Sequence, residues 1–241
     1  MKICTAQLTP FKGDIATNIV HHRKFIDLAV GAGARSIFFP ELSLTGYEPE
    51  LAKELAFNKD DTSLSIFQQV ANEHNIIIGV GMPTKNDPMS AISMLVFQPG
   101  QPMLIYSKSF LHEDERDFFT QGNDAGMVIG NTGIAPAICY EIMVPEHAEQ
   151  AAASGASIYA AGVVKSKKSI ENALNRMSVI AKTYSMPAIM ANSIGTTGGY
   201  DCPGRSSAWN SKGELVGQLN DTQQGILVFD IATGKAVANY L

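Results

Sequence analysis

Short apolar runs alternate with amphipathic stretches in two parts of the chain, and this alternation favours a layered α/β fold. In the first third, segments with apolar residues at helical spacing separate strand-like runs at 2–8, 36–39 and 75–81. The pattern returns after residue 139, where strand-like runs at 157–160 and 188–191 alternate with helical stretches at 145–153 and 174–184. We therefore expect helices that pack against the faces of β-sheets.

The remaining segments contain strands with little helix between them. Strand-like runs lie at 92–98, 102–106, 126–129 and 132–138, and again at 206–210, 215–219 and 226–231. Pro99 and Gly100 form a turn signal between the first two runs, which predicts a hairpin. A purely parallel, doubly wound sheet would leave such hairpins unexplained. The pattern instead predicts two sheets packed together with helices outside.

We expect a single domain over residues 1–241, because the chain contains no internal repeat, low-complexity tract or linker-like stretch. Hydrophobic residues make up 45% and charged residues 17%, which is enough to bury a core. No apolar run approaches the roughly 18 residues that a membrane span needs. The N-terminal MKICTAQL lacks the long apolar stretch and cleavage site of a signal peptide, so we expect a cytoplasmic protein without membrane contact.

Charge and cysteine content argue against several kinds of partner. The formal net charge is −5, and the basic run at 165–168 is typical of a solvated loop, so we expect no nucleic-acid partner. The three cysteines are an odd, widely spaced set, which suits neither a disulfide framework nor a zinc site. We interpret Cys4 as a core residue and Cys202 as a loop thiol.

Three predicted strands end abruptly in a reactive side chain. The run at 36–39 leads to Glu41, the run at 102–106 to Lys108, and the run at 132–138 to Cys139. Functional residues of α/β proteins gather at such strand ends. A thiolate can attack, a carboxylate can take and return protons, and an ammonium can stabilise an oxyanion. The set therefore suits covalent catalysis.

The segments around these residues resemble those of the nitrilase superfamily, the carbon–nitrogen hydrolases. The similarity rests on FPELSLTGY at 39–47, YSKSFLH at 106–112 and AICYE at 137–141. ANSIG at 191–195 and GRSS at 204–207 resemble later family segments, and the match extends from Met1 to about Asp230. At 180–187 the chain has IAKTYSMP where many members have a stretch similar to Arg-Ala-x-Glu-Asn, so no subfamily is assigned.

The resemblance implies a fold, an assembly and a set of roles. The fold would be a four-layer αββα sandwich of two mixed β-sheets flanked by helices, usually paired as a homodimer, with no metal or cofactor. Cys139 would be the nucleophile that forms a thioester, Glu41 the general base, and Lys108 the oxyanion stabiliser. The backbone N–H of Tyr140, which follows the nucleophile, would be a second oxyanion donor.

A second glutamate is expected in the loop after the lysine. The sequence DERDFFTQG at 114–122 resembles that loop, and Glu115 fits it best. Glu113 lies in the same acidic cluster and stays open as an alternative. A carboxylate there would place the substrate nitrogen or tune the base.

Several residues have more than one interpretation. A Cys–His pair is a competing arrangement, with His112 or His147 as the base; Glu41 is favoured because it lies in a family segment and neither histidine does. Glu141 either lines the pocket or forms a salt bridge within the following loop. Candidates for lining the pocket are Phe118, Phe119 and the segment 162–168.

The implied reaction is hydrolysis of a non-peptide carbon–nitrogen bond in a small linear amide or N-carbamoyl compound. A carboxylate base beside a lysine must be desolvated to reach a useful pKa, so we expect a narrow pocket. One alternative is nitrile hydrolysis by the same residues, and another is a non-catalytic dimer that binds a small molecule or a partner. An amine in place of water would make the protein an acyltransferase. The sequence does not name the substrate.

Overall fold

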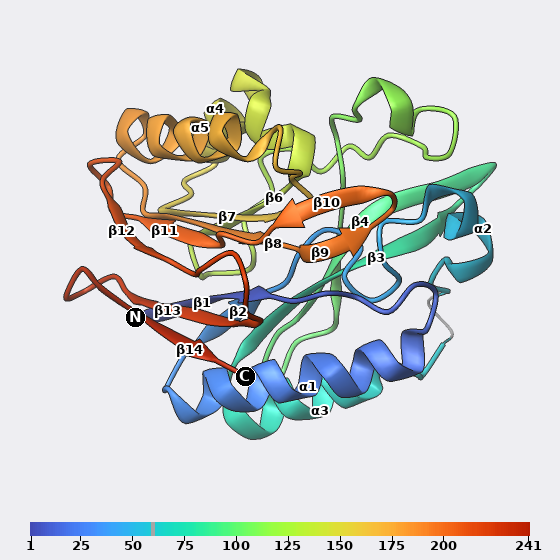
Figure 1. The fold of residues 1–241 in the computed structure, drawn as a ribbon, viewed down its shortest axis with the longest axis horizontal. Helices are drawn as coiled ribbons and strands as arrows, with labels where there is room; N and C mark the ends of the chain where they lie inside the picture. Colours follow the sequence, from blue (N-terminus) through green and yellow to red (C-terminus); the bar gives the residue numbers. More distant parts are fainter. Residues whose placement is uncertain (59–60) are drawn as a thin grey trace.

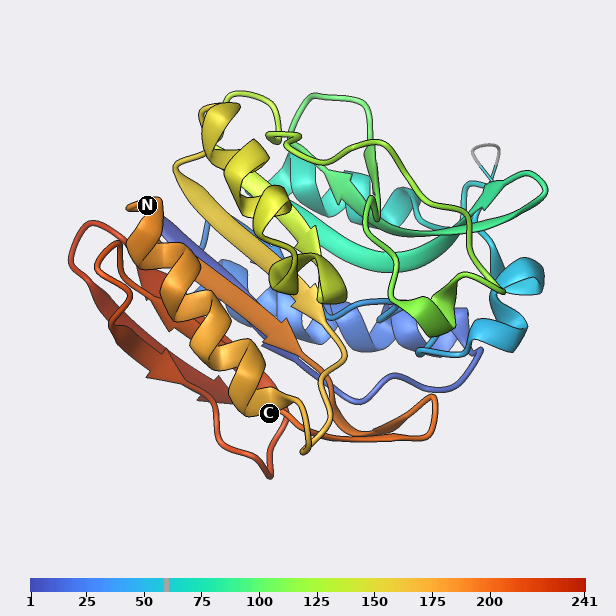
Figure 2. The same cartoon turned by 90° about the horizontal axis from the view of Figure 1, so that it is seen from above.

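Helices cover the outer faces of two stacked β-sheets, which gives four layers in the order αββα (Figure 1). The computed structural model describes residues 1–58 and 61–241. Helices α1 (Ile15–Gly31) and α3 (Ser65–His74) form one outer layer, and α4 (Pro145–Ala153) and α5 (Ile170–Thr183) form the other. Seen from above, α4 and α5 lie over the second sheet (Figure 2). The predicted sandwich is confirmed.

The sheet next to α1 and α3 has seven strands in the order β14-β13-β1-β2-β3-β4-β5. β1, β2 and β3 are parallel to one another, whereas every other pair is antiparallel, including the predicted β4–β5 hairpin. The strands are β1 (Lys2–Gln7), β2 (Ser36–Phe38), β3 (Ile77–Asn86), β4 (Met89–Phe97), β5 (Leu104–Ser107), β13 (Gly225–Asp230) and β14 (Lys235–Tyr240).

The second sheet has five strands in the order β12-β11-β8-β7-β6. β6, β7 and β8 are parallel, and β11 and β12 continue the sheet in antiparallel fashion. The strands are β6 (Ile134–Ile138), β7 (Ile158–Val163), β8 (Ala188–Asn192), β11 (Ser207–Trp209) and β12 (Leu215–Gln218). A separate hairpin and four short helices complete the described elements: β9 (Ile194–Thr197), β10 (Tyr200–Pro203), η1 (Pro49–Leu51), α2 (Ala52–Leu55), η2 (Glu113–Glu115) and η3 (Cys139–Met143).

Local sequence explains where the helices begin and end. Asp14 caps α1, because its carboxylate accepts the N–H of Thr17 at 3.0 Å. α3 ends at Asn75, which adopts a left-handed φ of 51°, and α4 starts with Pro145, whose missing N–H costs nothing in a first turn. Within the described residues, none of the helices has the length and apolarity to cross a bilayer.

Two clusters of buried apolar side chains hold the layers together. Phe25 of α1 and Phe67 of α3 pack with Val80 of β3 in the cluster between the helices and the seven-stranded sheet. The other cluster lies between the two sheets and beneath α5, and includes Phe229 and Met177. Each such side chain contributes about 1.5–3 kcal/mol when fully buried. The layers therefore form a rigid scaffold for the strand ends.

The prediction of a strand at 126–129 is wrong, because the structure has no strand there. Gly126 adopts a left-handed φ of 82°, and Met127 closes a turn by donating its N–H to the carbonyl of Asp124 at 2.9 Å. Ile129 is buried and Met127 and Val128 are partly buried, and the segment is irregular up to β6. Conversely, the sequence did not predict β9, β10 and β14. β14 pairs with β13 at the sheet edge with most of its side chains at least partly exposed, so it lacks the apolar signal of a core strand.

Candidate active site

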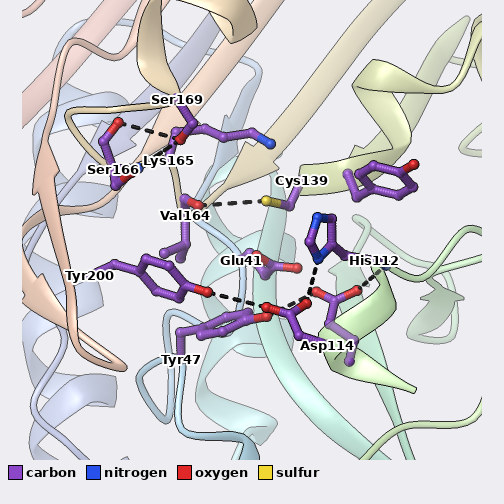
Figure 3. A pocket seen from close by; sticks show the side chains of 12 residues that line it. Glu41, Tyr47, His112, Asp114, Cys139, Val164, Lys165, Ser166, Ser169 and Tyr200 are labelled. Atoms are coloured by element: carbon purple, nitrogen blue, oxygen red, sulfur yellow. Dashed lines mark hydrogen bonds and ion pairs between the residues drawn. The ribbon is translucent and has the colours of Figure 1, made fainter. Parts of the chain in front are cut away.

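Strand ends from both sheets converge on one pocket of about 220 Å³ (Figure 3). β2 leads to Glu41, β5 to Lys108, β6 to Cys139 and β7 to Val164. Glu41, Cys139 and Val164 line the pocket. Lys108 is buried behind the pocket wall, where its ammonium contacts Glu41. The three residues that the sequence placed at strand ends therefore meet. Two antiparallel steps make β5 run in the same direction as β2 and β3, so Glu41 and Lys108 leave one edge of their sheet, and the second sheet brings Cys139 to the same place.

Cys139 begins η3 directly after β6, with a left-handed φ of 45°. This conformation costs a non-glycine residue about 1–2 kcal/mol and turns the chain sharply as it leaves the strand. Sγ donates a weak hydrogen bond to the carbonyl of Val164 at 3.6 Å. Burial and the charge of Glu41 raise the pKa of the thiol to about 11, against the opposing effects of Lys165 and Lys108. The thiol is therefore protonated near neutral pH and needs a base to become a nucleophile.

Lys108 is fully buried between two carboxylates. Its Nζ lies 2.8 Å from Oε1 of Glu41 and 2.5 Å from Oε1 of Glu115. Burial lowers the pKa of the ammonium, but the charges of Glu41, Cys139 and Glu115 outweigh burial and hold this pKa above its ordinary value. An unpaired buried charge is unfavourable by several kcal/mol, so the two carboxylates are what stabilise a cation here.

The two carboxylate oxygens of Glu41 differ in their hydrogen bonding. Oε1 accepts from Lys108, whereas the buried Oε2 has no hydrogen-bond partner within residues 1–58 and 61–241. Burial raises the pKa of this carboxyl, while Lys108 and the neighbouring Cys139 side chain act in the opposite direction. A buried oxygen without a hydrogen-bond partner destabilises the fold, so its presence in a native site calls for an explanation such as a catalytic role. This oxygen has the chemistry to accept a proton.

Glu115, and not Glu113, is the second carboxylate of this cluster. The Tyr47 hydroxyl donates to Oε1 of Glu115 at 3.0 Å, and the backbone N–H of His112 donates to Oε2 at 2.8 Å. Glu115 is buried at the end of η2, whereas Glu113 at its start is exposed. The short helix therefore separates the two neighbouring glutamates, and it brings Glu115, which the sequence favoured, into the cluster.

Two glycines allow the turn that carries Glu41 to fit between the sheets. A Cβ on Gly81 of β3 would lie 2.4 Å from the backbone nitrogen of Leu42, and one on Gly162 of β7 would lie 2.5 Å from the carbonyl oxygen of Phe39. Such contacts are far inside van der Waals distance. Any side chain at either position would displace the turn, so these glycines fix the place of the Glu41 backbone.

Glu141 lies in a buried polar network behind the pocket and does not line it, and its basic neighbour is His147 of α4, whose Nε2 lies 3.4 Å from Oε2 of Glu141. Its Oε1 accepts the N–H of Ser109 at 2.6 Å, and its Oε2 accepts the N–H of Ile138 at 2.7 Å and the hydroxyl of Tyr106 at 2.7 Å. Burial raises the pKa of the carboxyl to about 7, and these hydrogen bonds limit the rise. The carboxylate thus joins the residue after the lysine to the residue before the cysteine.

The two histidines occupy different environments. His147 is buried, with Nε2 at 2.7 Å from the Tyr106 hydroxyl and Nδ1 at 2.7 Å from the Tyr159 hydroxyl, and burial lowers its pKa to about 4. His112 lies at the pocket mouth, with Nδ1 at 2.5 Å from Asp114. Only His112 of the two therefore lines the pocket. In the described part of the chain, no group of three or more His, Cys, Asp or Glu side chains is arranged to hold a metal.

The pocket walls match the sequence expectations in part. Segment 162–168 contributes Val164, Lys165 and Ser166, as predicted. Phe119 does not line the pocket, because it is 1% exposed and packs in the core between the sheets. Phe118 faces a neighbouring hollow. The basic run at 165–168 is thus not uniformly a solvated loop.

Some wall residues were not predicted. Tyr47, Asp114 and Tyr200 line the pocket together with Tyr140, whose ring packs against His112 with centroids 5.0 Å apart. Tyr47 is the last residue of the motif at 39–47, and its place in that motif could have indicated that it lines the pocket. Tyr200 comes from the β9–β10 hairpin, whose place beside the pocket depends on tertiary structure alone.

Comparisons with known proteins identify the family. The family model described as carbon–nitrogen hydrolase matches residues 2–238. A "hydrolase in agr operon" of Staphylococcus aureus is 28% identical over 240 residues, which cover 96% of this chain and 91% of that protein. A glutamine-dependent NAD(+) synthetase of Aquifex aeolicus is 28% identical over 250 residues, covering 98% of this chain but only 43% of the synthetase.

Solved structures show the same fold. A cysteine-to-alanine mutant of the amidase from Nesterenkonia sp. AN1, in complex with butyramide, matches with a TM-score of 0.84. The sequences are 22% identical, and the match covers 95% of this chain and 89% of the amidase chain. The family match spans nearly the whole sequence, and the fold agrees with it. The chain belongs to the carbon–nitrogen hydrolase family.

Proposed function

We propose that the protein hydrolyses a non-peptide carbon–nitrogen bond in small linear amides or N-carbamoyl compounds, through a thioester at Cys139. The observation that carries the proposal is the buried cluster of Glu41, Lys108 and Glu115 beside the thiol. It combines a protonated nucleophile, a carboxylate oxygen that has no hydrogen-bond partner among the described residues, and a fixed ammonium. Membership of the carbon–nitrogen hydrolase family supports this choice of chemistry.

In the acylation step, the Glu41 carboxylate takes the thiol proton as Sγ of Cys139 attacks the substrate carbonyl carbon. The carbonyl oxygen becomes an oxyanion, which the Lys108 ammonium and the Tyr140 backbone N–H stabilise. One such donor commonly contributes about 3 kcal/mol to the transition state. The carbon–nitrogen bond then breaks, and protonated Glu41 gives its proton to the departing nitrogen. A thioester and free ammonia or amine result.

In the deacylation step, water attacks the thioester carbonyl while Glu41 takes one of its protons. The second oxyanion uses the same two donors. When it collapses, the carbon–sulfur bond breaks, Sγ recovers a proton from Glu41, and the carboxylic acid leaves. Glu115 holds Lys108 in place through both steps and is proposed as a positioning residue.

The pocket supports small substrates. Its volume of about 220 Å³ suits an amide with a short chain and does not admit an extended peptide. The amidase that shares this fold was solved with butyramide, an amide of that size. The same residues would also act on a nitrile: Cys139 adds to the nitrile carbon to give a thioimidate, a first water converts it to the thioester with release of ammonia, and a second water hydrolyses the thioester.

The experiment is ammonia release from a panel of small amides, N-carbamoyl amino acids and nitriles, with the wild type and Cys139→Ala. We expect release by the wild type and none above background by the variant. His112→Ala serves as a matched control for the Cys–His alternative and is expected to keep measurable turnover. Total loss in His112→Ala with the fold intact would contradict Glu41 as base.

Other results would redirect the proposal. Ammonia from nitriles but not from the matching amides would favour the nitrile alternative. No release from any compound, together with a Cys139 that alkylating reagents fail to label, would favour a non-catalytic binding protein.

We further propose that residues 1–241 act as one domain in a cytoplasmic homodimer. The family resemblance supports the dimer. Light scattering during gel filtration tests the assembly, and a mass of one chain would contradict it.

A further inference from the structure

Lys165 is a cation at the pocket wall beside the nucleophile. It follows Val164, whose carbonyl accepts the Cys139 thiol, and its positive charge acts on that thiol by lowering its pKa. In Figure 3 its side chain extends along the pocket wall toward Cys139. The ammonium is therefore close to where a substrate carbonyl would bind.

The backbone of Lys165 is held by one buried amide. Its N–H donates to Oδ1 of Asn192 at 2.8 Å, and its carbonyl accepts from Nδ2 of the same side chain at 3.2 Å. Asn192 is itself fully buried at the end of β8 and also donates to the carbonyl of Gly204 at 2.8 Å. The backbone of Lys165 is thus fixed in the pocket wall by these hydrogen bonds.

The charge of Lys165 has no ion-pair partner in the described part of the chain. No carboxylate oxygen of residues 1–58 or 61–241 lies within 4.0 Å of its ammonium. Lys108 is neutralised by two carboxylates, and the neighbouring Lys167 pairs at the surface with Asp201 at 2.8 Å. Lys165 is the pocket-lining cation that remains available to a ligand.

The same wall continues into the start of α5. Ser166 and Ser169 line the pocket next to Lys165, and α5 begins at Ile170. The N-terminal end of a helix carries a partial positive charge that attracts anions. On the other side of the mouth, Asp114 contacts His112 and Tyr200. An anionic group in the pocket would thus turn toward Lys165 and away from Asp114.

We propose that the substrate is an amide that also carries a carboxylate, and that Lys165 binds this carboxylate. The inference rests on the proposed function, because it names the substrate class of the same site. The carboxylate can belong to the acyl part, as in the monoamide of a dicarboxylic acid, or to the amine part, as in an N-carbamoyl amino acid. In both cases the amide carbonyl lies at Cys139 and the carboxylate lies at the Lys165 wall.

A simpler role for Lys165 would be to balance the net negative charge of the Glu41, Lys108 and Glu115 cluster. That role predicts an equal effect on charged and neutral amides. Carboxylate binding predicts a change in the ratio of their kcat/KM values. The ratio therefore distinguishes the two roles.

The experiment measures kcat/KM for succinamate and N-carbamoyl-β-alanine against butyramide. The proteins are the wild type, Lys165→Met, Lys165→Arg and, as a matched control from the same basic run, Lys168→Met. We expect the wild type to prefer at least one anionic substrate. Lys165→Met is expected to lower the ratio of anionic to neutral kcat/KM by about 10- to 100-fold, the usual range for a charged hydrogen bond. Lys165→Arg keeps most of the ratio, and Lys168→Met keeps all of it.

The anionic substrate that is preferred tells which part of the substrate carries the carboxylate. An unchanged ratio in Lys165→Met, or a wild type that prefers butyramide, would overturn the inference. A second measurement does not need turnover: succinate should slow alkylation of Cys139 in the wild type and not in Lys165→Met. If this protection occurs while no compound releases ammonia, the anion site stands and the proposed function fails. If neither occurs, both fail.

Discussion

At the scale of single residues, the site depends on one lysine shared by two glutamates. Lys108 is fully buried, so its position beside Cys139 depends on the charges that surround it. Glu41 contributes one charge, and its second oxygen has no hydrogen-bond partner in the part of the chain that the structure describes. Glu115 contributes the other charge and is itself held by Tyr47. One carboxylate therefore remains able to exchange protons while the other fixes the cation.

Glu115→Gln tests this division of roles. The change removes one of the two charges that hold Lys108, and we expect kcat/KM to fall about 10- to 100-fold, the range of one charged hydrogen bond. The matched control is Glu113→Gln, which changes the exposed glutamate two residues earlier and is expected to stay within about twofold of the wild type, as surface changes usually do. Ammonia release and thermal unfolding are measured for both. Equal losses in the two variants would contradict the assignment of Glu115.

At the scale of secondary-structure elements, the place of Glu41 is decided by the two strands that flank its turn. β3 and β7 come from different sheets, and each presents a glycine where the turn approaches. The turn itself contains a left-handed residue, Leu42, at a φ of 50°. The strands thus force a bent segment into the space between the sheets, where its carboxylate is desolvated.

Gly162→Ala tests this constraint. The added Cβ would lie 2.5 Å from the carbonyl oxygen of Phe39, so the turn must shift. We expect activity to fall more than about tenfold, because a displacement of about 1 Å at a reacting group can have that effect, and the free energy of unfolding to fall by about 1–3 kcal/mol. Gly31→Ala at the end of α1 is the control, since its Cβ would meet no atom within 4 Å. Wild-type activity in Gly162→Ala would show that the turn does not need this close packing.

At the scale of the whole molecule, the sandwich removes the site from water. The cluster of Glu41, Lys108 and Cys139 lies where the two sheets meet, and burial is the first cause that raises the pKa of both the carboxyl and the thiol. Burial thus favours the uncharged form of both groups, which places a proton donor and a proton acceptor side by side out of water. This condition comes from the packing of both sheets and not from any one segment.

The pH dependence of alkylation reports on this environment. Only the thiolate reacts, and the pKa of Cys139 is about 11, so the thiolate fraction rises as pH rises. We expect the rate of modification by iodoacetamide to increase about tenfold per pH unit between about pH 8 and 10, where an ordinary thiol with a pKa of about 8.5 would reach a plateau. Cys139→Ala is the control, because it reports any labelling of Cys4 and Cys202, which do not line the pocket. A plateau below about pH 9.5 would contradict the raised pKa.

Much of the architecture could be predicted because the strands and helices carry regular apolar patterns. The parallel strands at 36–39, 132–138 and 157–160 are short buried runs, and their ends indicated Glu41 and Cys139 without any coordinates. The strand prediction at 126–129 was wrong because the apolar residues there do not form a strand. These residues are buried or partly buried without pairing as a strand, and a glycine at positive φ turns the chain there.

The sequence by itself determined the layered fold, the strand ends and the three residues that meet there, because these follow from local patterns and chain order. The sequence favoured Glu115 and left Glu113 open, and tertiary structure decided between them, since one turn of η2 buries Glu115 and exposes Glu113. It also decided that Lys165, unlike the exposed lysines of the same basic run, lines the pocket near the nucleophile, since Asn192 of the adjacent strand holds its backbone. Such outcomes depend on contacts between segments far apart in sequence, and no local pattern encodes them.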